Sequence, residues 1–351
     1  MVARLRTLVI SDLHLGHVAR HDVLRLPGPR GKLLDSLADV DRLVLLGDIT
    51  ELMTRNPRRP LAVAEPVLRA FGQRLGPGGE IIVVPGNHDA PLARAWARAQ
   101  GDRLRIDSVV DPNASRALAR VVKWLAPARV RVHYPGVWLE DRIWATHGHY
   151  LDRHLLPESA FGILRRRGGG SSHARRGFRP SDYERHRSHS RRGRDPFVTQ
   201  FLDRPVGTLL ERASEFVRSA AVPALPQLLM NARLTPLTAA MIDLQMRRAS
   251  IPAMALVVRR LEIHADWVVF GHVHRAGPLP GEDTARWRPA NDSPRFLNTG
   301  SWLYEPLLID RASPPHPYWP GSAVVLEPGR EPRVIGLLDG LAHGDLRFAA
   351  G

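Results

Sequence analysis

Short apolar runs of strand length recur along the chain. The clearest four cover residues 7–10, 43–46, 81–84 and 267–270, and β-branched side chains make up a large share of them. That length and composition favour β-strands over buried helices. A shorter run, residues 142–146, predicts one further strand.

The pattern changes in the second half of the chain. Apolar positions recur at helical spacing in residues 197–222 and again in 236–261, and prolines punctuate both runs. We expect a helical cap that packs over or beside the rest of the fold. Because it is apolar and contains methionine, the cap could instead accommodate acyl chains or touch a membrane surface.

The length of the chain bounds its organisation. With 351 residues it can bury a substantial core, and one large domain with an elaboration fits better than two equal domains. We expect the core to be built from residues 1–150 and 263–351. The insertion between them, 151–262, would combine an Arg-rich loop, 165–194, with the helical cap.

Clusters of hard-metal ligands follow the five predicted strands. The candidate ligands are Asp12, His14, Asp48, Asn87, His147, His272 and His274. Functional loops gather beyond the carboxyl ends of parallel strands, so these side chains can converge on one edge of a sheet. Adjoining glycines, which permit sharp turns and close backbone approach, are Gly47, Gly86, Gly148 and Gly271.

The ligand set matches the needs of a two-metal site. Two divalent ions about 3.5–4 Å apart need one shared carboxylate, several neutral ligands, and open positions for hydroxide and a phosphoryl oxygen. One ion would be held by Asp12, His14, Asp48 and His274, and the other by Asp48, Asn87, His147 and His272. Metal-activated hydroxide would then attack phosphorus, with His88 left over as a proton donor.

Each cluster alone has a simpler interpretation. An isolated Asp-x-His is usually a surface turn, and Asp48 after a glycine could be a helix N-cap. Five such clusters, each after a strand, favour the metal site. Carboxylate, amide and imidazole ligands without any cysteine suit manganese, iron or zinc, and manganese is our first expectation. His149 could support the ligands, contact phosphate or be purely structural.

In this order the five clusters resemble the motif of the calcineurin-like metallophosphoesterase superfamily. The match runs from Leu8 to about Trp302, with one long insertion. The resemblance implies an α/β fold in which two mixed β-sheets form a sandwich flanked by helices, with the metal pair at the sheet edge. It also implies that His88 protonates the leaving oxygen or stabilises the phosphoryl group, and that Asp89 orients His88.

Finer features of the motifs point in two directions. The stretch 47–52 and the ending 298–302 look like those of UDP-2,3-diacylglucosamine pyrophosphatases, which cut a pyrophosphate bond at a membrane surface. However, those enzymes usually have Arg in place of His88 and Asp in place of His149. The Asp-Arg-Gly that protein serine/threonine phosphatases carry after the second motif is missing, which argues against that class.

Positive charge is concentrated in the Arg-rich loop. Residues 165–194 hold eleven arginines against Asp182 and Glu184, and so contribute +9 of the formal net charge of +15. Such a composition is typical of a mobile surface loop. The alternative is a patch that binds acidic phospholipid, nucleic acid or a polyphosphate substrate. No obligate protein partner is inferred.

Together these features predict a metal-dependent phosphoesterase that hydrolyses phosphate esters or pyrophosphate bonds. The alternatives are a nuclease of the same superfamily, a UDP-sugar-lipid pyrophosphatase at the membrane surface, and a non-catalytic scaffold, against which the intact ligand set argues. The chain has no cysteine, no apolar run of about 20 residues, and no room for a signal peptide before residues 7–10. We therefore expect a cytoplasmic protein, with peripheral contact to the inner membrane as an option.

Overall fold

The computed structural model describes residues 5–54, 56–154, 178–189, 249–309 and 311–348. The expected cap helix at 197–222 lies outside the described residues, as do residues 236–248 of the second cap run and most of the Arg-rich loop. Among the described residues, no helix combines the length and the apolar character that crossing a bilayer requires.

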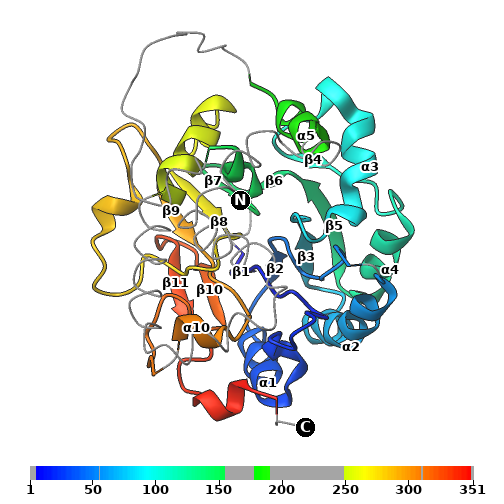
Figure 1. Ribbon diagram of the computed structural model, residues 1–351, viewed down its shortest axis with the longest axis vertical. Helices are drawn as coiled ribbons and strands as arrows, with labels where there is room; N and C mark the ends of the chain where they lie inside the picture. The colour runs from blue at the N-terminus through cyan, green and yellow to red at the C-terminus, as the bar shows by residue number, and fades with distance from the viewer. Residues whose placement is uncertain (1–4, 55, 155–177, 190–248, 310, 349–351) are drawn as a thin grey trace, which may run out of the picture.

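Two mixed β-sheets form the centre of the fold (Figure 1). The strands are β1 (Thr7–Ile10), β2 (Arg42–Leu45), β3 (Glu80–Val83), β4 (Ser108–Val109), β5 (Arg129–Tyr134), β6 (Gly136–Glu140), β7 (Ile143–Thr146), β8 (Trp267–Phe270), β9 (Arg295–Asn298), β10 (Ser322–Leu326) and β11 (Arg333–Gly336). The seven-stranded sheet has the order β11-β10-β1-β2-β3-β5-β4, and the four-stranded sheet has the order β6-β7-β8-β9. The expected pair of mixed sheets is confirmed.

The strands that matter for the site run parallel. In the larger sheet β1, β2, β3 and β5 are parallel neighbours, and in the smaller sheet β7, β8 and β9 are. The antiparallel strands β10, β11 and β4 flank the parallel part of the larger sheet, and β6 pairs antiparallel with β7. Parallel strands end at the same edge, so each sheet presents its loops together.

Successive side chains of a strand point to opposite faces of its sheet, and this alternation separates the apolar core into layers. In β1, Val9 packs into a core cluster shared by both sheets, whereas Leu8 and Ile10 belong to the cluster on the opposite face. That face is covered by α1 (Pro27–Ser36), α2 (Arg58–Leu75), α3 (Ala90–Gln100) and α4 (Arg116–Trp124). Figure 1 shows these helices together on one side of the molecule. The period-2 pattern thus places one apolar set between the sheets and the other under helices.

The outer face of the smaller sheet has its own cover. Trp144 and Phe270 pack with Met254 and Val258 of a helix over residues 249–260. The second cap run is therefore helical in its described part. The short 3-10 helix η3 (His149–Arg153) and the helix α5 (Pro180–His189) join this cluster, through Leu151 and Tyr183 respectively.

Short elements complete the described fold. They are η1 (Val23–Arg25), η2 (Gly101–Arg103), η5 (Thr284–Trp287), α10 (Pro306–Ile309) and η6 (His343–Leu346).

The Arg-rich segment is not a loop throughout. Helix α5 lies inside it, and Ser181, Tyr183 and Glu184 are buried. Figure 1 shows α5 beside α3, and Ser181 Oγ donates to Asp102 Oδ1 at 3.0 Å. The expectation of a loop is wrong at these residues because α5 is held by the aromatic packing of Tyr183 and by side-chain hydrogen bonds, rather than by an apolar stripe.

Two helix glycines provide a test of the packing. A Cβ added to Gly72 in α2 would lie 2.3 Å from the carbonyl oxygen of Leu125, whereas a Cβ on Gly31 in α1 would meet nothing within 4 Å. We expect Gly72→Ala to lower the free energy of unfolding by about 1–3 kcal/mol through overpacking. Gly31→Ala should raise it by about 0.5–1 kcal/mol, because alanine loses less backbone entropy on folding. Urea unfolding of both variants checks this, and equal shifts would contradict the packing described here.

Candidate metal centre

The predicted ligands lie just beyond the ends of five strands. Asp12 follows β1, Asp48 follows β2 and Asn87 follows β3 in the larger sheet, while His147 follows β7 and His272 follows β8 in the smaller one. Backbone hydrogen bonds tie these loops to one another. The N–H of Asp12 donates to the carbonyl of Gly47 at 3.0 Å, and the N–H of Gly271 donates to the carbonyl of His147 at 3.0 Å.

Most of these residues have an unusual backbone conformation. Positive φ angles occur at Asp12 (54°), His14 (42°), Asp48 (50°), His272 (72°) and His274 (56°). Side-chain-bearing residues adopt this left-handed region rarely, and its cost is tolerated mainly where the surrounding structure fixes the conformation at a functional site. Five of the eight non-glycine residues with positive φ in the described part of the chain are therefore among the predicted ligands.

One group of possible ligands contains Asp12, His14 and His274. The Nε2 atom of His274 lies 3.2 Å from Asp12 Oδ1, and the Nε2 atoms of the two histidines lie 3.2 Å apart. Asp12 Oδ2 accepts hydrogen bonds from the hydroxyl of Ser11 and the N–H of His272, whereas Oδ1 makes no hydrogen bond within the described residues. A buried carboxylate oxygen that faces two imidazole nitrogens is well suited to a cation.

A second group contains Asp48, His147 and His272, with Asn87 beside it. The Nε2 atom of His147 lies 3.2 Å from Asp48 Oδ2 and 3.1 Å from Asn87 Oδ1. Its Nδ1 lies 3.0 Å from the carbonyl of Leu46, which can only accept, so Nδ1 carries a hydrogen. In the neutral ring Nε2 then carries a lone pair that points toward two oxygen acceptors. A cation between these three atoms would remove their mutual repulsion.

Asp48 lies between the two groups. Its Oδ2 is 3.8 Å from His14 Nε2 of the first group, in addition to the contact with His147 of the second. Its Oδ1 accepts from the backbone N–H of His88 at 2.7 Å. The backbone at His88 therefore orients the Asp48 side chain, whose other oxygen, Oδ2, faces both groups.

Glycines make this close approach feasible. A Cβ on Gly86 would lie 2.2 Å from Asp48 Oδ1, and a Cβ on Gly47 would lie 2.4 Å from His147 Nδ1. Real Cβ atoms do not approach other atoms this closely, so both positions require glycine. The chain thus leaves room for the ligands by omitting two side chains.

The pKa values reflect charges packed in a buried space. Burial opposes the ionisation of Asp12 and Asp48, but neighbouring histidines, chiefly His274 and His147 respectively, hold the pKa of each carboxyl below its usual range. Burial likewise opposes protonation of His147, yet Asp48 and Asp12 raise its pKa to about 9. Protonated imidazoles compensate these carboxylates, and divalent cations that displace the protons do the same. The residues present therefore fit a metal site.

The sequence analysis did not anticipate the role of Glu51. Its Oε1 lies 2.6 Å from His88 Nδ1, and its Oε2 lies 3.0 Å from His14 Nδ1. These are hydrogen-bond lengths, so Glu51 bridges the two histidine rings, and the three side chains also lie close enough together to form a third group of possible metal ligands. Burial opposes ionisation of Glu51, but His14 and His88 lower its pKa to about 2. In the sequence, the only sign of this role is that Glu51 lies three positions after Asp48.

We expected Asp89 to orient the His88 ring, but within the described residues its carboxylate has other partners. It is fully buried and accepts hydrogen bonds from the N–H groups of Ile49 and Thr50, at 2.8 and 2.9 Å, and from the Thr50 hydroxyl at 2.7 Å. Burial and the neighbouring charge of Asp48 raise its pKa. Asp89 therefore fixes the loop after Asp48, while Glu51 contacts His88.

Two further histidine environments complete the site. Asp152 Oδ1 lies 2.8 Å from His272 Nε2, and this carboxylate was not anticipated either. His149 is buried, and its Nε2 lies 3.3 Å from the hydroxyl of Tyr134. The His149 ring lies next to that of His147, with centroids 5.6 Å apart. These contacts give His149 a supporting position behind the ligands.

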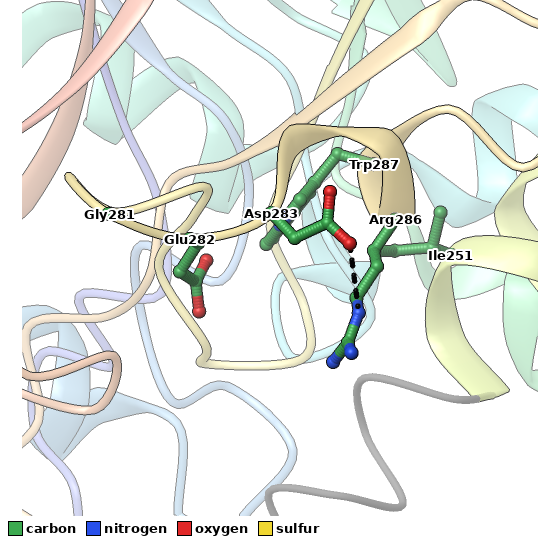
Figure 2. Close-up of a pocket in the computed structure, with 6 residues that line it drawn as sticks. All are labelled: Ile251, Gly281, Glu282, Asp283, Arg286 and Trp287. Atoms are coloured by element: carbon green, nitrogen blue, oxygen red, sulfur yellow. Dashed lines mark ion pairs between the residues drawn. The ribbon is translucent and has the colours of Figure 1, made fainter.

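A pocket elsewhere is separate from this cluster. It has a volume of about 280 Å³, and it is lined by Ile251, Gly281, Glu282, Asp283, Arg286 and Trp287. Figure 2 shows it between the η5 segment and the helix that carries Ile251, with an ion pair of 3.4 Å between Asp283 and Arg286. None of the predicted ligands lines it, so it is not part of the candidate metal centre.

The comparison with known protein families agrees with the motif. A family model for calcineurin-like phosphoesterases matches residues 5–205, a range that ends before His272 and His274. No curated protein matches the chain. A nuclease, MPE, from Pseudomonas putida is a similar solved structure at 20% identity and a TM-score of 0.24, and the match covers 40% of this chain and 53% of the nuclease. The chain thus spans about half of that protein.

Another similar structure is a cold-active protein-tyrosine phosphatase from a psychrophilic Shewanella species. It is 13% identical with a TM-score of 0.31, and the match covers 97% of this chain and 80% of the phosphatase. Both TM-scores are too low to bear on activity.

Gly86, which packs against the Asp48 side chain, allows a test of the cluster that changes no proposed ligand. Gly86→Ala should displace the Asp48 carboxylate and weaken Mn²⁺ binding about 10- to 100-fold, the usual effect of disturbing the support of a metal ligand. Gly340→Ala is the control, because a Cβ there meets nothing within 4 Å. Calorimetric titration measures both. Unchanged binding in Gly86→Ala would show that Asp48 is not a ligand.

Proposed function

The chain belongs to the calcineurin-like phosphoesterase family, whose members are metal-dependent hydrolases, and from this premise we propose that it hydrolyses phosphate esters or pyrophosphate bonds at the cluster around Asp48. The observation that carries the proposal is the position of this carboxylate. It is 1% exposed and faces His14 on one side and His147 on the other. Such a shared acidic ligand is what a two-metal phosphoesterase needs.

The proposed ligands divide between two ions. The first is held by Asp12, His14, Asp48 and His274, and the second by Asp48, Asn87, His147 and His272. When bound, such ions supply a water of lowered pKa and offset the negative charge of the phosphoryl oxygens. Oxygen and imidazole ligands suit manganese, iron or zinc, and Mn²⁺ is the first ion to test.

His88 is the proposed proton donor to the leaving oxygen. Its Nδ1 is engaged by Glu51, which leaves Nε2 to transfer the proton, and its side chain is 18% exposed. Glu51 fixes the ring and offsets the positive charge that the ring carries when both nitrogens are protonated. Because Glu51 also contacts His14, it links the orientation of the proton donor to that of a metal ligand.

Replacing the shared carboxylate is expected to remove at least one of the two ions. Asp48→Asn should lower turnover of bis-p-nitrophenyl phosphate by at least about 10³-fold, since even one lost electrostatic contact in an active site costs about 10²–10³. Metal content, measured on the same material, should fall from two ions to one or none. Asp266→Asn is the control, because Asp266 is exposed and forms an ion pair with Arg142, which is exposed as well. Full activity in Asp48→Asn would contradict the proposal.

The role of His88 predicts a dependence on the leaving group. His88→Ala should keep both ions and lose about 10²–10⁴-fold in kcat on an alkyl phosphate ester, whose alkoxide needs a proton. The loss should be much smaller for a p-nitrophenyl ester, because p-nitrophenolate leaves without protonation. His264→Ala, at an exposed histidine, is the control. An equal loss on both substrates would refute proton donation by His88.

A further inference from the structure

Asp152 contacts a proposed metal ligand from an unexpected place. It lies in η3, directly after β7, and its carboxylate accepts from His272 Nε2 at 2.8 Å. A carboxylate that holds one nitrogen of an imidazole fixes the ring and directs the other nitrogen to the metal. His272 would therefore bind through Nδ1, in the group that it forms with Asp48 and His147. The position of Asp152 depends in turn on what holds η3.

Helix α5 holds η3 on both sides of Asp152. The contacts are Tyr150 Oη to Glu184 Oε1 at 2.9 Å, Arg153 Nη1 to the Asp182 carbonyl at 3.1 Å, and His154 Nε2 to Tyr183 Oη at 2.9 Å. The rings of Tyr150 and Tyr183 also stack, with centroids 4.4 Å apart and planes inclined by 6°. Helix α5 therefore fixes the 3-10 turn from which Asp152 projects.

Glu184 is the central group of this attachment. It is 6% exposed, and its Oε1 accepts from the hydroxyls of both Tyr134 and Tyr150, at 2.5 and 2.9 Å. Because Tyr134 donates to Glu184, its oxygen can accept from His149 Nε2, which lies 3.3 Å away. Hydrogen bonds to a buried carboxylate are strong, and loss of the acceptor would remove one such bond from each of the two tyrosine hydroxyls.

We propose that Glu184 is a positioning residue of the metal centre. It anchors η3 through Tyr150, so that Asp152 keeps His272 in its ligating orientation, and it anchors His149 through Tyr134. The inference rests on the proposed function, because it assigns the support of one of the two ions. Helix α5 then supports the metal site through a buried carboxylate whose hydrogen bonds, within the described residues, are to two tyrosines and not to a proposed ligand.

Metal binding by the full-length chain tests the proposal without a need for turnover. Mn²⁺ affinity is measured by competition with a chromogenic chelator, and unfolding is followed separately by heating. Asp152→Asn should weaken one of the two ions about 10- to 100-fold and leave the other unchanged. Glu184→Ala should weaken the same ion. Glu184→Gln, which keeps an acceptor oxygen in place, should retain most of the affinity.

A pair of hydroxyl deletions provides the matched control. Tyr150→Phe removes the hydroxyl that joins η3 to Glu184, whereas Ser181→Ala removes one that joins α5 to Asp102 near η2. Both can lower the midpoint of thermal unfolding, but only Tyr150→Phe should weaken the ion. If Glu184→Ala fails to fold, the comparison of Tyr150→Phe with Ser181→Ala tests the proposal in its place. Equal effects on metal affinity, or none from Tyr150→Phe, would overturn the proposal.

A double variant tests whether Glu184 acts through Asp152. Residues that act in series are not additive, so Asp152→Asn combined with Glu184→Ala should lose clearly less affinity than the two single losses combined. Full additivity would overturn the proposed route. Failure of the proposed function is distinguishable, because the unmodified chain would then bind no ion pair at all.

Discussion

The structure depends on the cost of holding two carboxylates, Asp12 and Asp48, in a buried space. They are 0% and 1% exposed, and burial without compensation would strongly disfavour their charged forms. The compensation comes from imidazoles that surround them, chiefly His14, His147 and His274. The left-handed backbone at both aspartates and the glycines packed against Asp48 and Asp12 follow from this arrangement. Two divalent cations would supply the same compensating positive charge.

The proposed ligands come from both sheets of the sandwich. Loops after β1, β2 and β3 supply Asp12 with His14, Asp48 and Asn87, while loops after β7 and β8 supply His147, His272 and His274. Neither sheet holds a complete set, so the packing between them fixes the geometry of the centre. Val9, Val44 and Val269 belong to the cluster between the sheets and alternate with residues that face outward. The core therefore determines the register in which the two half-sites meet.

Much of this arrangement could be predicted from short-range patterns. Uninterrupted apolar runs gave β1 and β8 with the observed bounds, and strand ends predicted the convergence of the ligands. The supporting carboxylates could not be predicted in this way. Asp152 lies 120 positions from His272, and Glu51 lies 37 positions from His88. A hydrogen bond between residues so far apart leaves no periodicity in the sequence.

Helix α5 was missed for a related reason. Its buried residues include Ser181 and Glu184, so its attachment depends on hydrogen bonds to Asp102 and to two tyrosines rather than on an apolar stripe. An arginine-rich composition gave no sign of this polar contact. The domain boundaries that place α5 in an insertion remain a prediction, as do the cap residues outside the described part of the chain.

The most direct test of the central claim is anomalous X-ray diffraction from crystals of the protein grown with Mn²⁺. The account predicts two peaks about 3.5–4 Å apart, one beside Asp12, His14 and His274 and one beside Asn87, His147 and His272. The Asp48 carboxylate should lie between them. A single peak, or two peaks that Asp48 does not bridge, would contradict it.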